Sequence, residues 1–201
     1  SINAQHNLSV VTDRLNKNYS RLSSGLRIAT ASDDAAGLAI SERLRAQVRS
    51  LQRAQMNAND GISMVQTAEG ALNEVSGMLV RMRELAIEAN NGALVGADQD
   101  SLQAEFSALI DEIDRISQAT TFNNVNLLDG TTSTLTFQVG AGTTTNVDTI
   151  DLNLANMRST TLGIDSLDIG SAGNVSAAII AIDAAIDTVT SSRGDFGAVQ
   201  N

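Results

Sequence analysis

The stretch RLSSGLRIATASDDAAGLAIS, residues 21–41, interrupts a sequence that otherwise has the periodicity of long helices. The Ser-Ser-Gly run at 23–25 breaks the preceding apolar pattern, and small and polar residues follow it. Ser32 or Asp33 is suited to cap a following helix, and paired aspartates favour the positive end of that helix. The stretch therefore predicts that one helix stops, a tight connector follows, and a second helix starts.

The segment before this connector, residues 1–24, carries a heptad pattern. The spacing of its apolar positions alternates between four and three, which is typical of a narrow coiled-coil stripe. An asparagine on such a stripe is a residue type that fixes helix register. The stripe consists of Ala4, Leu8, Val11, Leu15, Asn18 and Leu22.

The segment after the connector predicts a very long helix, from about Asp34 to about Asn90, with an apolar register that shifts after Val65. The glycine- and asparagine-rich run 90–100 ends it, and a further apolar stripe over 102–116 predicts a third helix.

The pattern changes at residue 131. Segments 134–141 and 145–154 are rich in Thr, Val and Ile or Phe, and a Gly/Thr link lies between them, which predicts a β-hairpin. Residues 156–174 are irregular and return the chain. From Val175 to the last residue the periodicity is helical again.

These elements predict a mainly α fold: an elongated antiparallel coiled-coil helical bundle, built from both ends of the chain, with a small β-hairpin. Residues 1–130 and 175–201 are expected to form one helical rod domain together. Residues 131–174 are expected to form the hairpin and a return segment attached to the same domain. No large outer domain is expected.

The composition narrows the function. The 201 residues carry a net charge of −10, so nucleic acid is a poor partner. The charge is unevenly distributed along the chain. Residues 1–60 hold eight basic and five acidic side chains, whereas the remaining residues hold five basic and eighteen acidic ones. Two interpretations stay open: helix faces that complement each other or a second copy, which is favoured, and an anion-binding face. The candidates for that face are Arg43, Arg45 and Arg49.

Catalysis is not expected. His6 is the only histidine and there is no cysteine, so neither a catalytic triad nor a transition-metal site is available. We therefore expect no enzyme activity, no cofactor and no metal. We find no apolar run of membrane-spanning length and expect no membrane insertion. The sequence has no initiator Met and starts and ends within helical patterns, so we expect that both ends were trimmed.

Several segments resemble bacterial flagellin, in the order that this family has them. The connector is similar to the most recognisable N-terminal signature of the family. The other similar segments are NANDGISMVQTAEGALNE (57–74), RMRELAIEANNG (81–92), LQAEFSALIDEIDRIS (102–117), TFNNVNLLDG (121–130), FQVGA (137–141) and AIDAAIDTVTSSRGDFGAVQN (181–201). The resemblance covers nearly the whole chain and suggests a core fragment without the extreme terminal helical segments.

This resemblance implies a structural subunit of the bacterial flagellar filament, which self-assembles into a helical polymer for motility at the cell surface. Other flagellin subunits are then the expected partners. The alternative is a surface-displayed relative that acts as an adhesin or binding module for an acidic glycan or a host receptor.

The resemblance also implies which residues make contacts. The connector residues Arg21, Ser23, Ser24, Gly25 and Arg27 are expected to contribute to contacts between subunits. Some flagellins are bound by a Toll-like innate immune receptor, and the matching positions are Arg81, Leu85 and Glu105. A subunit interface is the favoured interpretation of that second patch for the native role.

Overall fold

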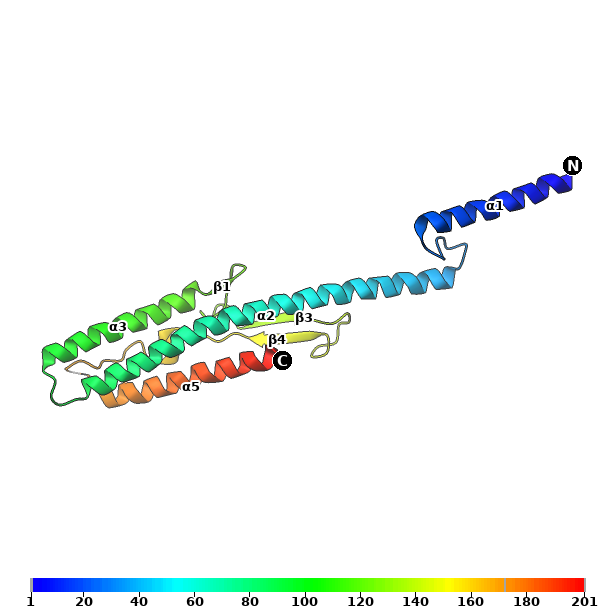
Figure 1. The fold of residues 1–201 in the computed structure, drawn as a ribbon. Coiled ribbons are helices and arrows are strands. Elements are labelled where there is room, and N and C mark those ends of the chain that lie inside the picture. Colours follow the sequence, from blue (N-terminus) through cyan, green and yellow to red (C-terminus); the bar gives the residue numbers. More distant parts are fainter. Residues whose placement is uncertain (1, 172, 201) are drawn as a thin grey trace. The chain divides into compact units, whose positions relative to one another are not determined.

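The computed structural model describes residues 2–171 and 173–200. Within these residues the chain forms five helices and two small antiparallel sheets (Figure 1). The mainly α fold with a small hairpin is therefore confirmed. The elements are α1 (Ile2–Ser24), α2 (Ala35–Ala89), α3 (Gly96–Ala119), β1 (Thr121–Phe122), β2 (Val125–Asn126), β3 (Thr134–Gln138), β4 (Thr149–Asn153), α4 (Ser159–Leu162) and α5 (Val175–Gln200).

The chain divides into two compact units, residues 1–53 and residues 54–201. Unit 1 holds α1, the connector and the first part of α2, and unit 2 holds the rest. The assignment of all the long helices to a single rod domain stays a prediction.

Helix α1 forms where the heptad predicts it, but its apolar stripe has no cover. No described residue of unit 1 is buried. Leu8 is 68% exposed, Leu15 53% and Leu22 83%. The apolar positions Leu44, Val48 and Leu51 at the start of α2 are exposed as well. Periodicity predicts the apolar face correctly and leaves open what packs against it.

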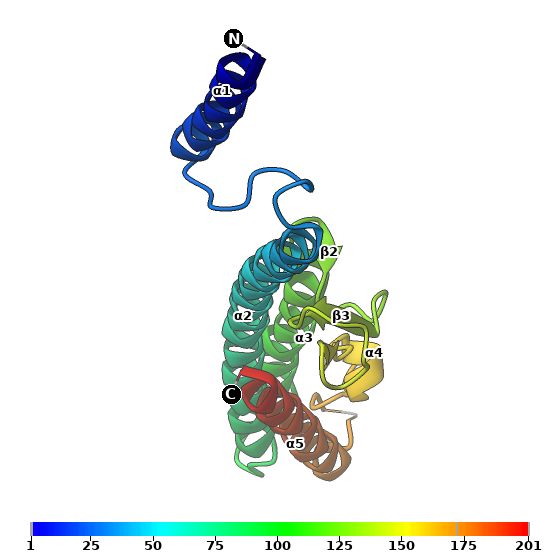
Figure 2. The same ribbon diagram turned by 90° about the vertical axis from the view of Figure 1, so that its right-hand side faces the viewer.

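The core lies in unit 2, where the second half of α2 lies beside α3 and α5 (Figures 1 and 2). The apolar register predicted after Val65 is the one that is buried. The seven apolar residues of this register, Ala68, Leu72, Val75, Leu79, Met82, Ala86 and Ala89, are each at most 1% exposed. Phe106 and Ile113 of α3 and Phe196 of α5 belong to the same core.

Helix α5 is long and apolar enough to correct the statement that the sequence has no apolar run of membrane-spanning length. It is 26 residues long and has a window of mean hydropathy 1.4, so by length and composition it resembles a membrane span. Its Ile182, Val189 and Phe196 are nevertheless buried in the core of unit 2. A helix with a buried stripe of this kind is typical of a protein core, and we interpret α5 as a core helix.

The predicted hairpin is present as β3 and β4, paired from Thr134↔Asn153 to Gln138↔Thr149. Leu152 is buried, and Phe137 packs against the core of unit 2. The Phe137 ring lies against Gly61 of α2, where a Cβ would make a van der Waals contact with the ring at 3.4 Å. Asn57 Nδ2 also donates to the Gln138 carbonyl at 3.0 Å. The hairpin is therefore fixed to α2 at two positions one turn apart.

Two short elements were not predicted. Strands β1 and β2 are joined through Asn123 and Asn124, both with positive φ (47° and 65°). Asparagine tolerates this left-handed region better than most residues. Helix α4 has four residues and ends at Gly163, with φ 71°. Elements this short are too brief to show a periodicity.

Candidate functional site

The connector of unit 1 is closed at its first end by Gly25. This residue directly follows α1 and has φ 68°, the left-handed conformation in which glycine commonly ends a helix. The Ser24 hydroxyl donates to the Arg21 carbonyl and accepts from the Leu26 N–H, both at 3.3 Å. The predicted helix stop at residues 23–25 is therefore confirmed.

The second end of the connector is capped by Asp34. Its Oδ1 accepts a hydrogen bond from the Gly37 N–H at 2.8 Å, the usual geometry of a helix N-cap. The prediction of Ser32 or Asp33 as the cap was wrong by one or two residues. A Cβ on Gly37 would lie 2.8 Å from Ile28 Cδ1 and closer still to Asp34 Oδ2, so this turn accepts no larger residue without a shift.

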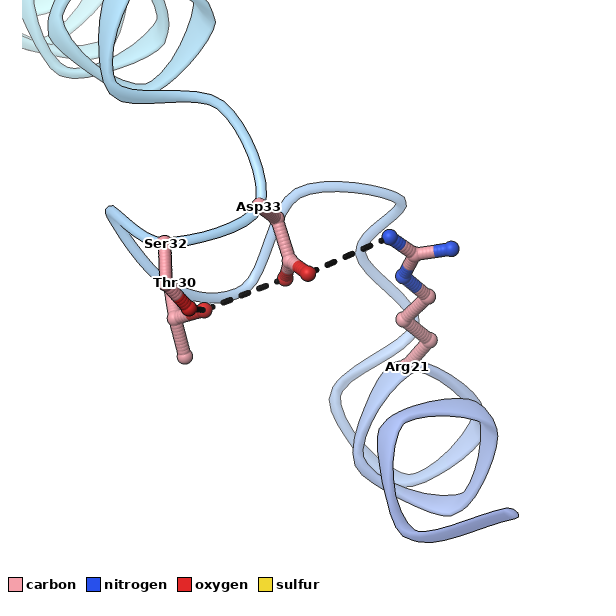
Figure 3. Close-up of polar contacts among 4 residues, drawn as sticks. All are labelled: Arg21, Thr30, Ser32 and Asp33. Atoms are coloured by element: carbon pink, nitrogen blue, oxygen red, sulfur yellow. Dashed lines mark hydrogen bonds and ion pairs between the residues drawn. The ribbon is translucent and has the colours of Figure 1, made fainter. Parts of the chain in front are cut away.

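Asp33 instead braces the connector from inside. Its Oδ1 lies 3.3 Å from Arg21 Nη2, and its Oδ2 accepts from the Thr30 hydroxyl at 3.2 Å (Figure 3). Thr30 Oγ1 also lies 2.9 Å from Ser32 Oγ. Arg21 thus bridges the last turn of α1 and the residues before α2. Sequence reasoning missed this pair, because a contact across an irregular loop has no periodic signal.

The ionisation of Asp33 follows from this setting. Desolvation favours the neutral acid, but the Thr30 hydrogen bond and the Arg21 charge oppose it. Together with hydrogen bonds from the backbone they hold the pKa of Asp33 below its usual range. The carboxylate is therefore charged at neutral pH, and the brace is present there.

An open groove lies beside this brace within unit 1. It has a volume of about 480 Å³ and is lined by Asn18, Arg21, Leu22, Gly25, Leu26 and Arg27. The structure thus brings together three of the five predicted connector residues, Arg21, Gly25 and Arg27. The groove combines apolar surface with two cationic side chains. Ser23 and Ser24 are exposed next to it in the sequence.

The arginines at the start of α2 do not form one face. Arg45 and Arg49 are separated by one turn, but residues two apart, such as Arg43 and Arg45, point to different sides of a helix. Arg45 is also paired with Glu42 at 2.9 Å. The predicted anion-binding face is corrected on this ground and reduces to Arg45 and Arg49.

The second predicted patch, Arg81, Leu85 and Glu105 of unit 2, contains both exposed and buried residues. Arg81 of α2 reaches Glu105 of α3 at 2.8 Å and Glu84 at 3.2 Å, and all three side chains are about half exposed. Hydrogen bonds to Glu105 and Glu84 raise the pKa of the Arg81 guanidinium. Leu85, in contrast, has no exposed area and belongs to the core. Its choice as a contact residue is therefore corrected.

Among the described residues, no group of three or more His, Asp or Glu side chains is arranged to hold a metal ion. The groove of unit 1 places charged and apolar groups side by side.

The comparison with known proteins gives these surfaces their context. The family described as "Bacterial flagellin N-terminal helical region" matches residues 1–133. The flagellin of Halalkalibacterium halodurans is 44% identical over the whole chain, which covers 74% of that protein. The chain belongs to the bacterial flagellin family. Flagellins are the structural subunits of the extracellular filament used in motility, so the predicted function and location are confirmed at the level of the family.

Other flagellins give the extent of the match. The phase 2 flagellin of Salmonella abortus-equi is 48% identical over 177 residues. The match covers 88% of this chain and 34% of that flagellin. The crystal structure of Bacillus cereus flagellin superposes with a TM-score of 0.63 and 32% identity, over 72% of this chain and 82% of that one. A putative flagellar hook-associated protein from Vibrio parahaemolyticus has the same fold, with a TM-score of 0.66 and 20% identity, over 86% of this chain and 90% of that chain.

Proposed function

We propose that this flagellin chain polymerises into the filament through unit 1, whose uncovered apolar stripe on α1 packs against helices of other copies. The observation that supports the proposal is that none of the described residues 2–53 is buried, although α1 carries a complete heptad stripe. At about 25 cal/mol per Å², leaving such a stripe in water is costly, and a neighbouring helix removes that cost.

The geometry of the stripe fits a helical partner. Apolar residues spaced four and three apart form a narrow strip, which is covered by one or two helices with the same spacing. Copies that join head to tail through two different surfaces build an open helical polymer when the rotation between them does not close into a ring. A role in assembly requires no catalytic group, and we infer that the chain is structural rather than enzymatic.

Assembly is tested on the stripe itself. We would measure polymerisation by sedimentation and electron microscopy, for the 201-residue chain and for a chimaera completed to the length of the Halalkalibacterium halodurans flagellin. Leu15→Glu places a charge on the stripe, and Ser20→Glu places the same charge on α1 away from it. We expect Leu15→Glu to abolish filaments and Ser20→Glu to leave them intact. Filaments that tolerate Leu15→Glu would refute the proposal.

The connector groove is proposed as a second contact between subunits, through Arg21, Gly25 and Arg27 with Ser23 and Ser24 beside them. Apolar surface next to fixed cations is suited to a partner surface that supplies carboxylates. Arg27→Glu is expected to weaken polymerisation. The matched control is the same charge reversal at another arginine of unit 1 that does not line the groove, Arg14→Glu. Equal effects of the two substitutions would assign the result to net charge alone.

The exposed pair Arg81 and Glu105 is proposed as an interface, with another subunit as the favoured partner and a Toll-like innate immune receptor as the second. An arginine held by two carboxylates is preorganised for contact. Arg81→Glu is expected to reduce polymerisation, with Arg115→Glu on α3 as the control. Binding of the receptor ectodomain to the monomer, measured separately, distinguishes the two partners.

An acidic glycan is the last proposed partner, on Arg45 and Arg49 only. Binding of this kind is expected to weaken as salt is raised. Titration of a sulfated oligosaccharide into the chain, with and without Arg45→Ala and Arg49→Ala, is the test. Binding that is unchanged by the double substitution would exclude this surface.

A further inference from the structure

The turn between α2 and α3 contains a labile pair of residues. Asn91 and Gly92 form the only Asn-Gly dipeptide in the sequence, and both residues are exposed. They lie outside the helices, just after α2 ends at Ala89. Asparagine is a thermally labile residue, because its side-chain amide can be attacked by the backbone nitrogen of the next residue.

The contacts around this pair leave the attacking atom available. The Leu94 N–H donates to the Asn91 carbonyl at 3.0 Å, and the Ala93 N–H donates to Asn91 Oδ1 at 3.2 Å. Among the contacts of the described residues, the Gly92 N–H donates no hydrogen bond. No atom would lie within 4 Å of a Cβ on Gly92, so nothing shields this position.

We propose that Asn91 is a site of spontaneous deamidation in the folded protein. The Gly92 nitrogen forms a bond to Asn91 Cγ and loses its proton to water, and the side-chain nitrogen leaves as ammonia. Water then opens the resulting succinimide at either carbonyl and leaves aspartate or isoaspartate at position 91. The reaction needs no enzyme and no oxidant, and water is the only co-reactant.

The hydrogen bond from Ala93 favours the first step. Negative charge develops on Asn91 Oδ1 when Cγ is attacked, and a donor that is already in place stabilises that charge. Glycine at position 92 contributes as well, because it has no side chain to obstruct ring closure and adopts a wide range of backbone angles.

Two Asp-Gly dipeptides in the same chain could form the same succinimide, but their structural settings disfavour it. Asp60 and Gly61 lie inside α2, where the backbone nitrogen is engaged in the helical hydrogen-bond pattern. Asp129 and Gly130 are protected differently. Asp129 is 7% exposed, and its oxygens accept hydrogen bonds from the Thr131 N–H and hydroxyl and from Asn126. A carboxylate held in this way is ionised and is a poor target for attack.

The consequence for the protein is a new charge at a helix end. Deamidation adds a negative charge next to the C-terminus of α2, where the helix dipole disfavours it. Isoaspartate also inserts one backbone carbon into the turn that joins α2 to α3. The link between two helices of the unit 2 core therefore changes with the age of the molecule.

The reaction is measured by incubating the folded chain at mildly alkaline pH and mapping tryptic peptides by mass spectrometry. Residues 84–115 form one such peptide, and its fragment ions separate Asn91 from Asn90. Digestion in water enriched in oxygen-18 marks any deamidation that occurs during the digest. We expect Asn91 to convert faster than every other asparagine of the chain.

Gly92→Ala is the matched variant, since it keeps the amide and hinders ring closure. A barrier raised by about 1.4 kcal/mol corresponds to a reaction about tenfold slower. A synthetic peptide of residues 87–96 gives the rate of the same sequence without the fold. A folded chain that deamidates at Asn91 far more slowly than this peptide, or at a rate unchanged by Gly92→Ala, would overturn the proposal.

Discussion

Asp114 of α3 holds Ser159, the first residue of α4, through both oxygens of its carboxylate. Oδ1 accepts from the Ser159 N–H and Oδ2 from the Ser159 hydroxyl, each at 2.7 Å. The two residues are 45 positions apart, and Ser159 is only 2% exposed. This contact fixes the chain that returns from the hairpin against the helical core.

Asp114→Ala is expected to lower the free energy of unfolding of unit 2 by about 1–3 kcal/mol, because it leaves two buried donors of Ser159 without a partner. Urea denaturation followed by circular dichroism measures the change. Asp111→Ala, on the same helix and exposed, is the control and is expected to have little effect. Equal effects of the two substitutions would show that the contact contributes nothing specific.

Two glycines are expected to respond in opposite ways to alanine. Gly70 lies within α2, and no atom lies within 4 Å of the place that an added methyl group would take, so Gly70→Ala is expected to stabilise the helix by about 0.5–1 kcal/mol. Gly130 has φ 79°, and a Cβ there would lie 2.5 Å from Asn156 Nδ2. Gly130→Ala is therefore expected to destabilise the protein by more than about 1 kcal/mol. Thermal unfolding of both variants is the measurement, and shifts of the same sign would contradict the prediction.

Leu85 is expected to behave as a core residue and not as a contact residue. Leu85→Ala is expected to cost about 2–5 kcal/mol of stability, because it opens a cavity among the α2, α3 and α5 side chains. Val80→Ala, at an exposed position of the same helix, is expected to change stability by about 0.5 kcal/mol or less. The fraction of unfolded Leu85→Ala chain must therefore be measured before any loss of binding by this variant is assigned to a lost contact. A variant as stable as the original chain would refute the assignment to the core.

Asp129 is expected to make stability depend on pH in the acid range. The hydrogen bond from the Thr131 hydroxyl, followed by those from its N–H and from Asn126 and by the charge of Arg158, holds the pKa of Asp129 below its usual value against desolvation. The unfolded chain then binds the proton first, so this stabilisation is complete above the unfolded pKa of about 3.9. It is lost as pH falls through the lower pKa of the folded state.

Asp129→Asn tests this assignment. The variant is expected to be less stable than the original chain at neutral pH and to lose less stability on acidification from about pH 5 to pH 2. Unfolding curves at a series of pH values give the comparison. Parallel pH profiles for the two proteins would show that other carboxylates are responsible.

The sequence predicted the long helices well because heptad spacing is a strong signal for a helix with one apolar face. It predicted the buried register from Ala68 to Ala89 but not Leu85, which lies beside that register. Helix α2 contacts both α3 and α5, so its buried surface is wider than the stripe of a two-helix coiled coil. The position of Leu85 follows from this third helix, which a heptad alone does not reveal.

The connector shows the other limit. Its glycine and the start of the next helix follow from residue preferences. The Arg21–Asp33 brace depends on the path of a loop, and loop paths follow from many weak local contacts. The same holds for Asp114 and Ser159, which are 45 positions apart and meet only when the residues between them are folded.

The placement of the aromatic residues gives the molecule an unusual optical property. Tyr19 on α1 is the only tyrosine, there is no tryptophan, and the four phenylalanines all lie in unit 2. Ultraviolet fluorescence of this chain excited above the phenylalanine band therefore comes from α1 alone. Since Tyr19 is 64% exposed, its emission and its quenching by small solutes report when a neighbour covers that helix. Tyr19 is therefore an intrinsic probe of the surroundings of α1, and no added dye is needed.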